Sequence, residues 1–180
     1  MKPAQVVTLG LGLIASMQVK AETLSLGSPF PKLILEGKNG GKLDGSSWST
    51  AELPGKAWSL FYVDPDEKDL NKDAQEALKA KKIPVEKLRS LAIINMAATV
   101  IPNFLISGRI EKSQKEYPNT VYVKDLNKVG VKTWGLADDS SNVVIIGPDG
   151  QVKYFFKGKL PPDEIQKMIE AVEKTVAEML

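Results

Sequence analysis

The apolar residues of the chain fall into short runs that alternate with polar segments, and most of these runs have the length of a β-strand. The run at 57–63 (AWSLFYV) is almost continuously apolar, as expected of a central strand that is buried on both faces. The segments 33–35 (LIL) and 42–43 (KL) flank a glycine-rich segment, which predicts a short hairpin. The segment 147–150 (GPDG) predicts a second hairpin. The remaining strands are predicted at 90–96, 120–123, 143–146 and 151–156.

Three further segments carry apolar residues at helical spacing. In the first, Asp64 has the features of an N-cap, Pro65 suits the first helical position, and Glu67 completes a capping box. Leucine and alanine residues then recur at helical spacing up to Lys82, so we predict a continuous helix there. The other two helices are predicted from Pro102 to the Tyr117-Pro118 pair and from Asp163 toward the C-terminus.

The order of these elements predicts the fold class. A strand–helix–strand unit, an intervening helix, and a hairpin followed by a last helix form the thioredoxin layout. We therefore predict an α/β, thioredoxin-like fold in which helices flank a central mixed sheet. The chain contains no internal repeat and no linker-like segment, so residues 22–180 are expected to form a single domain.

Residues 1–21 have the features of a signal peptide. Lys2 precedes a mostly apolar run at 6–17, and small or modest side chains lead to a cleavage point after Ala21. The run is shorter than the about 20 apolar residues that a membrane-spanning helix needs, so we expect no permanent membrane anchor. A buried N-terminal helix is the alternative interpretation. The sequence thus predicts an exported protein that is periplasmic or secreted.

Removal of this segment changes the charge of the protein. The whole chain has 24 basic and 22 acidic residues, and the loss of Lys2 and Lys20 leaves 22 of each. The richest basic stretch, at 68–89, is interleaved with acidic residues, so its long-range attraction for phosphates largely cancels. We therefore expect no nucleic acid among the partners of the protein.

The chain contains no cysteine and no histidine. Without cysteine there is no thiol nucleophile and no disulfide, which excludes thiol–disulfide oxidoreductase and peroxiredoxin activity. Without histidine there is no Ser-His-Asp triad and no histidine-ligated zinc. The chemistry left to the chain is that of carboxylates, hydroxyls, amides and amines.

Four segments, in their order and spacing, resemble a known family. They read WSTAELPGK (48–56), IINMAATVIP (93–102), KEYP (115–118) and ADDSSNVVIIGPDGQVKYFFKG (137–158). With them, the sequence resembles the YtfJ family of bacterial periplasmic proteins, a cysteine-less thioredoxin-like group of unassigned function. The resemblance covers nearly the whole chain. It implies a thioredoxin-like fold and a periplasmic location, and it supplies no catalytic residue.

The chain departs from working thioredoxins at both halves of the redox site. Thioredoxins place their cysteines where the first central strand meets its helix, and this chain has Asp64-Pro65-Asp66-Glu67 there. The free N–H groups of a helix N-terminus that stabilise a thiolate would stabilise carboxylates here. Thioredoxins also have a cis-proline beside that site, and the corresponding place near Ser140 and Ser141 has no proline.

The predicted fold brings several of these polar residues to one sheet edge. Because open α/β sheets bind ligands at the carboxyl ends of their strands, we predict a binding site at that edge. Its candidate residues are Asp64, Asp66, Glu67, Asp138, Asp139, Ser140, Ser141 and Asn142. Carboxylate, hydroxyl and carbonyl oxygens suit a hard cation, with calcium the best candidate, although the spacing is not that of an EF-hand. The alternative is that Asp64 and Glu67 cap a helix while the other acids are solvated loop residues.

The sequence favours a binding protein over an enzyme. Paired carboxylates could perform acid–base chemistry, and Lys56 with Ser140 and Ser141 could form a serine–lysine nucleophile, but strand and turn roles explain these three residues as well. We expect a redox-inactive exported protein that binds a periplasmic protein, a peptide or a small ligand. Asn142 and its flanking backbone are the candidate edge for a peptide. A calcium-binding or carboxylate-based site at the same edge is the alternative function, and no other cofactor is expected.

Overall fold

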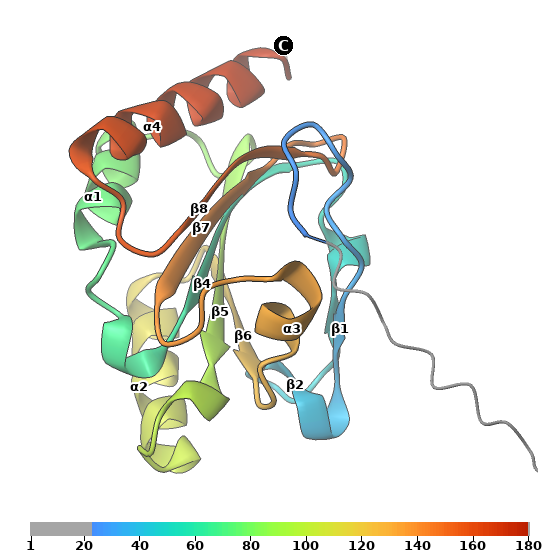
Figure 1. Cartoon of the computed structure of the whole chain (residues 1–180), viewed down its shortest axis with the longest axis vertical. Coiled ribbons are helices and arrows are strands. Elements are labelled where there is room, and N and C mark those ends of the chain that lie inside the picture. Colours follow the sequence, from blue (N-terminus) through green and yellow to red (C-terminus); the bar gives the residue numbers. More distant parts are fainter. Residues whose placement is uncertain (1–22, 180) are drawn as a thin grey trace, which may run out of the picture.

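The computed structural model describes residues 23–179, so the predicted signal peptide at 1–21 lies outside the described residues. Over 23–179, no helix is both long enough and apolar enough to cross a membrane. The described chain contains a central sheet with helices on both of its faces (Figure 1).

The central sheet has six strands in the order β2-β6-β5-β4-β7-β8. Strands β4, β5 and β6 are parallel to one another, whereas β2 and β7 pair antiparallel with β6 and β4, and β8 pairs antiparallel with β7. This arrangement confirms the predicted mixed sheet. A separate two-stranded ladder joins β1 to β3. The strands are β1 (Ile34–Leu35), β2 (Gly40–Lys42), β3 (Trp48–Ser49), β4 (Ala57–Val63), β5 (Leu88–Asn95), β6 (Thr120–Asp125), β7 (Ser141–Ile146) and β8 (Val152–Lys157).

The two faces of the sheet are covered differently (Figure 1). Helices α1, α2 and α4 lie on one face, while α3 and the N-terminal segment with β1 lie on the other. The α-helices are α1 (Lys72–Ala80), α2 (Asn103–Glu116), α3 (Val129–Trp134) and α4 (Pro162–Ala177). Single 3-10 turns occur at Gly37–Asn39, Thr50–Glu52, Pro65–Glu67 and Met96–Ala98.

Strand β4 supplies side chains to the cores on both faces, as its apolar sequence predicts. Leu60 and Tyr62 pack in the cluster that contains the fully buried Trp134 of α3. Phe61 and Val63 point the other way and pack in the cluster beneath α1 and α4. Because every residue of β4 is buried, this strand fixes the centre of the fold, and the loop that follows it is held in place.

The predicted hairpin between 33–35 and 42–43 is wrong. Leu35 pairs with Trp48 of β3, and β2 pairs with β6 instead. The glycine-rich segment does form a 3-10 turn at Gly37–Asn39, but the strands on either side of this turn do not pair with each other. A Cβ on Gly40 would lie 1.9 Å from the carbonyl oxygen of Lys124, and the residue has a φ of 125°. Glycine is required because the backbone of β2 approaches β6 closely in a left-handed conformation.

The continuous helix predicted after Asp64 is also interrupted. A 3-10 turn at Pro65–Glu67 comes first, and α1 starts only at Lys72. The predicted capping box is absent, because the side chain of Asp64 caps no N–H of its own turn. One oxygen of that carboxylate instead accepts a hydrogen bond from the backbone N–H of Ser140, 2.6 Å away. The N–H of Ser140, which is distant in the sequence, has thus replaced the N–H groups of the local turn as the partner of this carboxylate.

Helix α3 was not predicted from the sequence. The carboxylate of Asp125, at the end of β6, accepts hydrogen bonds from the backbone N–H groups of Asn127, Val129 and Gly130, at 2.8–3.0 Å. These bonds satisfy the free N–H groups at the start of a six-residue helix. The hydroxyl of Tyr62 donates to the same carboxylate at 2.9 Å, which ties α3 to the centre of β4.

Candidate functional site

The carboxyl ends of two parallel strands meet the start of β7 at one edge of the sheet. Val63, the last residue of β4, pairs with Ile94 of β5 on one side and with Ser141 of β7 on the other. Asp64 follows directly, and two hydrogen bonds tie it to Ser140. Its carboxylate accepts from the backbone N–H of Ser140, and its own N–H donates to the carbonyl of Ser140. The sheet register therefore places the residues after β4 beside the loop that precedes β7, as the sequence predicted.

Three of the predicted residues come together in an acidic cluster. Asp64, Asp138 and Asp139 each offer a carboxylate oxygen, and these three oxygens lie within 4.8 Å of one another. Asp64 is only 1% exposed, whereas Asp138 and Asp139 are exposed to solvent. Asp139 has a φ of 49°, a left-handed conformation that aspartate tolerates better than most residues. The cluster is therefore buried at Asp64 and open to solvent at its rim, which Asp138 and Asp139 form.

Two residues that the sequence analysis did not identify complete this cluster. The side-chain amide of Asn95, the last residue of β5, donates to Asp138 at 3.2 Å. The ammonium of Lys128 lies 2.6 Å from the other oxygen of Asp138 and forms an ion pair with it. A polar residue that ends a buried strand could have pointed to Asn95, but no sequence pattern links Lys128 to Asp138.

Two buried oxygens of these residues have no hydrogen-bond partner within residues 23–179. One is Oδ1 of Asp64, and the other is Oδ1 of Asn95, a residue with no exposed surface. An unsatisfied buried polar atom costs about 1–3 kcal/mol, so each of the two requires an explanation. A cation bound at the cluster, or a proton on the carboxyl group, would satisfy the oxygen of Asp64.

The electrostatic environment of Asp64 raises its pKa to about 6. Burial is the main cause, and the nearby charges of Asp138 and Asp139 add to it. The hydrogen bond from the backbone N–H of Ser140 and the nearby amide of Asn95 lower the pKa of Asp64 and offset part of this rise. At the rim, the ion pair with Lys128 lowers the pKa of Asp138. The cluster thus has one carboxyl that titrates near neutrality and another that stays ionised.

The other predicted site residues serve different parts of the structure. Asp66 and Glu67 lie on the 3-10 turn and are not members of the cluster. The side chain of Asn142 makes two hydrogen bonds of 2.9 Å with the backbone of Ala137, and so holds the loop that carries the acidic residues. Ser141 is buried, and its side chain lies on the same face of β7 as that of Val143, which is the face that α1 and α4 cover.

Comparison with known proteins identifies the family. The family model described as a bacterial protein of unknown function, YtfJ_HI0045, matches residues 34–175. The chain belongs to this family. It is 30% identical over 132 residues to the uncharacterized protein YtfJ of Escherichia coli, with 71% of each chain covered. It is also 25% identical over 179 residues to an uncharacterized protein of Haemophilus influenzae, covering 93% of this chain and 96% of that one.

Solved structures that resemble this YtfJ-family chain share its fold. A thiol peroxidase from Chromobacterium violaceum matches with a TM-score of 0.60 at 14% identity, over 86% of this chain and 90% of that one. The exposed lipoprotein thioredoxin of Streptococcus pneumoniae matches with a TM-score of 0.53 at 13% identity, over 78% and 98%. These likenesses confirm the thioredoxin-like fold and nothing beyond it. Because this chain has no cysteine, it has the fold without the thiol.

Proposed function

We propose that this protein is an exported, redox-inactive binding protein whose ligand is a divalent cation, with calcium as the preferred ion. Asp64, Asp138 and Asp139 would supply the carboxylate oxygens. One observation carries the proposal. A buried carboxylate oxygen of Asp64, which has no hydrogen-bond partner among the described residues, lies at a cluster of two further carboxylates.

The donor set supports a hard cation. Every candidate ligand atom is an oxygen, which suits calcium and magnesium and not the softer transition metals. Two oxygens bound to one calcium ion can be separated by up to about 5 Å, and for magnesium the limit is about 4 Å. The separations of at most 4.8 Å within the cluster fall inside the limit for calcium. Water would complete the coordination.

Lys128 is expected to weaken this binding. Its ammonium already neutralises Asp138, so an incoming cation must compete with it or enter beside it. The charge of Asp64 also depends on pH, because a carboxyl with a pKa of about 6 must lose its proton before it binds a metal. We therefore expect affinity in the range of extracellular calcium modules, about 0.1–1 mM, rising with pH through about 6.

An extended peptide is less well supported at this edge. In a sheet-edge complex the peptide would bond to free backbone groups of the receptor. The N–H of Ser140 donates to Asp64, and the carbonyl of Ser140 accepts from the N–H of Asp64. The carbonyl of Ser141 accepts from Gly158 and from Asn71. Binding of a peptide or a periplasmic protein at this edge remains an untested prediction.

Calorimetric titration of calcium into the mature protein tests the proposal. Asp139→Asn is the most informative variant, because asparagine tolerates the left-handed backbone of this residue while it removes the charge. It should weaken binding at least about tenfold, which corresponds to about 1.4 kcal/mol. Asp66→Asn makes the same chemical change outside the cluster and should leave the affinity unchanged. Lys128→Gln should strengthen binding.

Two results would refute calcium binding at this cluster. One is the absence of saturable heat below about 10 mM calcium, ten times the weakest expected dissociation constant. The other is an equal loss of affinity in Asp66→Asn and Asp139→Asn. Export needs a separate test, by mass spectrometry of the protein recovered from bacteria that express the full chain. Cleavage after Ala21 predicts a mature N-terminus at Glu22, and an intact N-terminus at Met1 would contradict it.

A further inference from the structure

A groove lies over the sheet between α1 and α2, and none of the residues that line it belongs to the acidic cluster. Its volume is about 640 Å³, within the range of about 300–1,000 Å³ that is usual for small-molecule sites. The floor includes Ala92 and Ile94 of β5 and Tyr122 of β6, which are only partly buried although they lie on inner strands of the sheet. The groove exists because α1 is only nine residues long and because β5 presents the small side chains of Ser90 and Ala92 there.

The rim of this groove is positively charged. Four lysines and a single glutamate, Glu76, are among the residues that line it. Lys68 pairs with Asp69, and Lys72 lies 3.9 Å from Glu76. Lys79 and Lys82 form no ion pair with any residue of the described chain.

The two unpaired lysines mark one end of the groove. Both belong to the C-terminal end of α1, and the ammonium of Lys79 lies 5.7 Å from the centre of the ring of Tyr117, which ends α2. Lys79, Lys82 and Tyr117 all line the groove, whose floor here is apolar. This end of the groove can bind an anionic group, and the remainder of it can bury a hydrocarbon.

We propose that this groove binds an anionic amphiphile with a single acyl chain, such as a long-chain carboxylate. The carboxylate would lie between Lys79 and Lys82, and the chain would cover Ala92 and Ile94. A peptide strand is excluded as the occupant of this floor, because β5 already pairs with β4 on one side and β6 on the other and so offers no free backbone. This site is separate from the proposed cation site and does not depend on it.

The backbone of Lys82 supports this assignment and provides a test variant. Its φ of 49° is a left-handed conformation, in the position after a helix where glycine is usual. A residue other than glycine in that region costs about 1 kcal/mol or more. Lys82→Gly removes the charge and also relieves the backbone strain, so this variant should be at least as stable as the wild type. A loss of ligand binding in it could not be attributed to unfolding.

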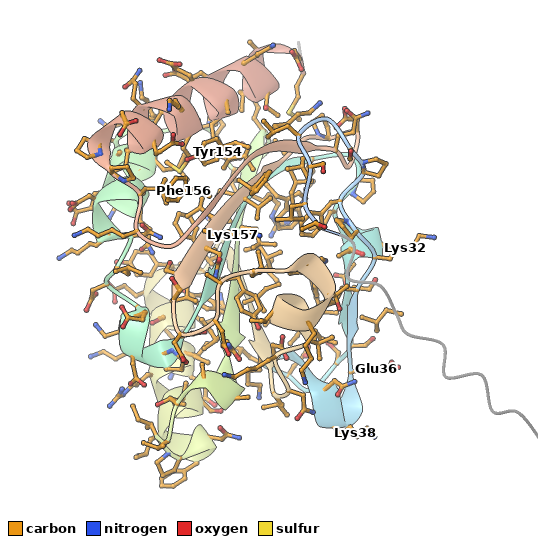
Figure 2. All side chains as sticks on the ribbon, in the orientation of Figure 1. Lys32, Glu36, Lys38, Tyr154, Phe156 and Lys157 are labelled. Carbon is orange, nitrogen blue, oxygen red and sulfur yellow. The ribbon has the colours of Figure 1, made fainter. Side chains whose placement is uncertain are left out.

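The experiment is a titration of the mature protein with dodecanoate, in the presence of a chelator so that no calcium is bound. We expect one saturable site, and weaker binding by about tenfold in the double variant Lys79→Gln/Lys82→Gly. Lys38→Gln is the matched control, because Lys38 is exposed on the far side of the molecule from α1 (Figure 2). Dodecanol, which has the same chain without the charge, should bind at least about tenfold more weakly than dodecanoate.

Three results would overturn the proposal. They are a failure of dodecanoate to saturate, equal binding of dodecanol and dodecanoate, and a loss of affinity in Lys38→Gln as large as that in the double variant. A second variant tests the floor directly. Ala92→Leu fills the groove, and it should abolish binding while circular dichroism shows a folded protein. Unchanged affinity in a folded Ala92→Leu protein would also refute the assignment.

Discussion

Replacement of Asp64 by asparagine should stabilise the protein at neutral pH. The change preserves the size of the side chain, and the amide oxygen of asparagine can still accept the hydrogen bond from Ser140. The substitution also removes a buried charge that is repelled by Asp138 and Asp139. Asp64, a residue of the proposed ligand site, thus lowers the stability of the protein when no ligand is bound.

The size of the effect follows from the pKa of Asp64. That pKa rises from 3.8 to about 6 in the folded protein, and about two pKa units correspond to about 3 kcal/mol. A carboxyl whose pKa is raised by folding binds more protons in the folded state, so it favours folding at low pH. This favourable contribution to the unfolding free energy is lost as the pH rises from about 4 to about 6. At about pH 8 the carboxylate is fully charged, and its whole destabilising effect is present.

Urea unfolding followed by circular dichroism, with a chelator present, measures this effect. The difference in unfolding free energy between Asp64→Asn and the wild type should grow by about 2 kcal/mol between about pH 4 and about pH 8. Comparison of the two proteins at each pH cancels the contributions that the other carboxyl groups make to stability. Several of these groups have lowered pKa values, so their contributions change with pH in the opposite direction. Asp66→Asn makes the same substitution at an exposed position outside the cluster and is the matched control. A constant difference for Asp64→Asn would refute the reasoning.

Two further predictions concern the packing around α1, α2 and α3. Gly130→Ala should destabilise the protein by about 1–3 kcal/mol, because its Cβ would lie 2.4 Å from the buried ring of Tyr62. Gly108→Ala in α2 should instead stabilise the protein by up to about 1 kcal/mol, because its Cβ would meet no atom within 4 Å. Equal midpoints of thermal unfolding for the two alanine variants would contradict this contrast. Asn71→Ala should cost about 3 kcal/mol in urea unfolding, because the buried amide makes three hydrogen bonds that join α1 to β7 and to the chain after β8. A loss below about 1 kcal/mol would mean that water replaces these bonds.

The parts of the fold that sequence reasoning predicted well are those set by hydrophobic burial. The run AWSLFYV at 57–63 became β4, buried throughout, because only a central strand can bury every residue of such a run. The segment that begins at Asp163 became α4, whose apolar side chains, such as Met168 and Val172, pack in the core. These patterns depend on local spacing alone, and a sequence displays them directly.

The parts that could not be predicted depend on partners distant in the sequence. Asp64 has every local feature of an N-cap, yet Ser140, which is 76 positions away, takes its carboxylate. Lys128 pairs with Asp138 only because the loop between β6 and β7 folds back over the sheet edge, and a surface lysine carries no pattern that announces this. The sequence located the edge of the candidate site because strand order determines where loops meet. The contacts within that edge are tertiary, and so they required the structure.

The two left-handed glycines of β2 have a consequence for how this protein behaves in a crowded compartment. β2 covers only the last three residues of β6, and its own outer side is engaged where the N–H of Lys42 bonds to the carbonyl of Ser46. An exposed, regular edge strand can pair with the edge of another molecule and begin aggregation. A short edge that is kinked at Gly40 and Gly41 presents no straight row of free backbone groups to a second chain. The irregularity that made this segment look like a turn is thus a built-in protection against sheet extension.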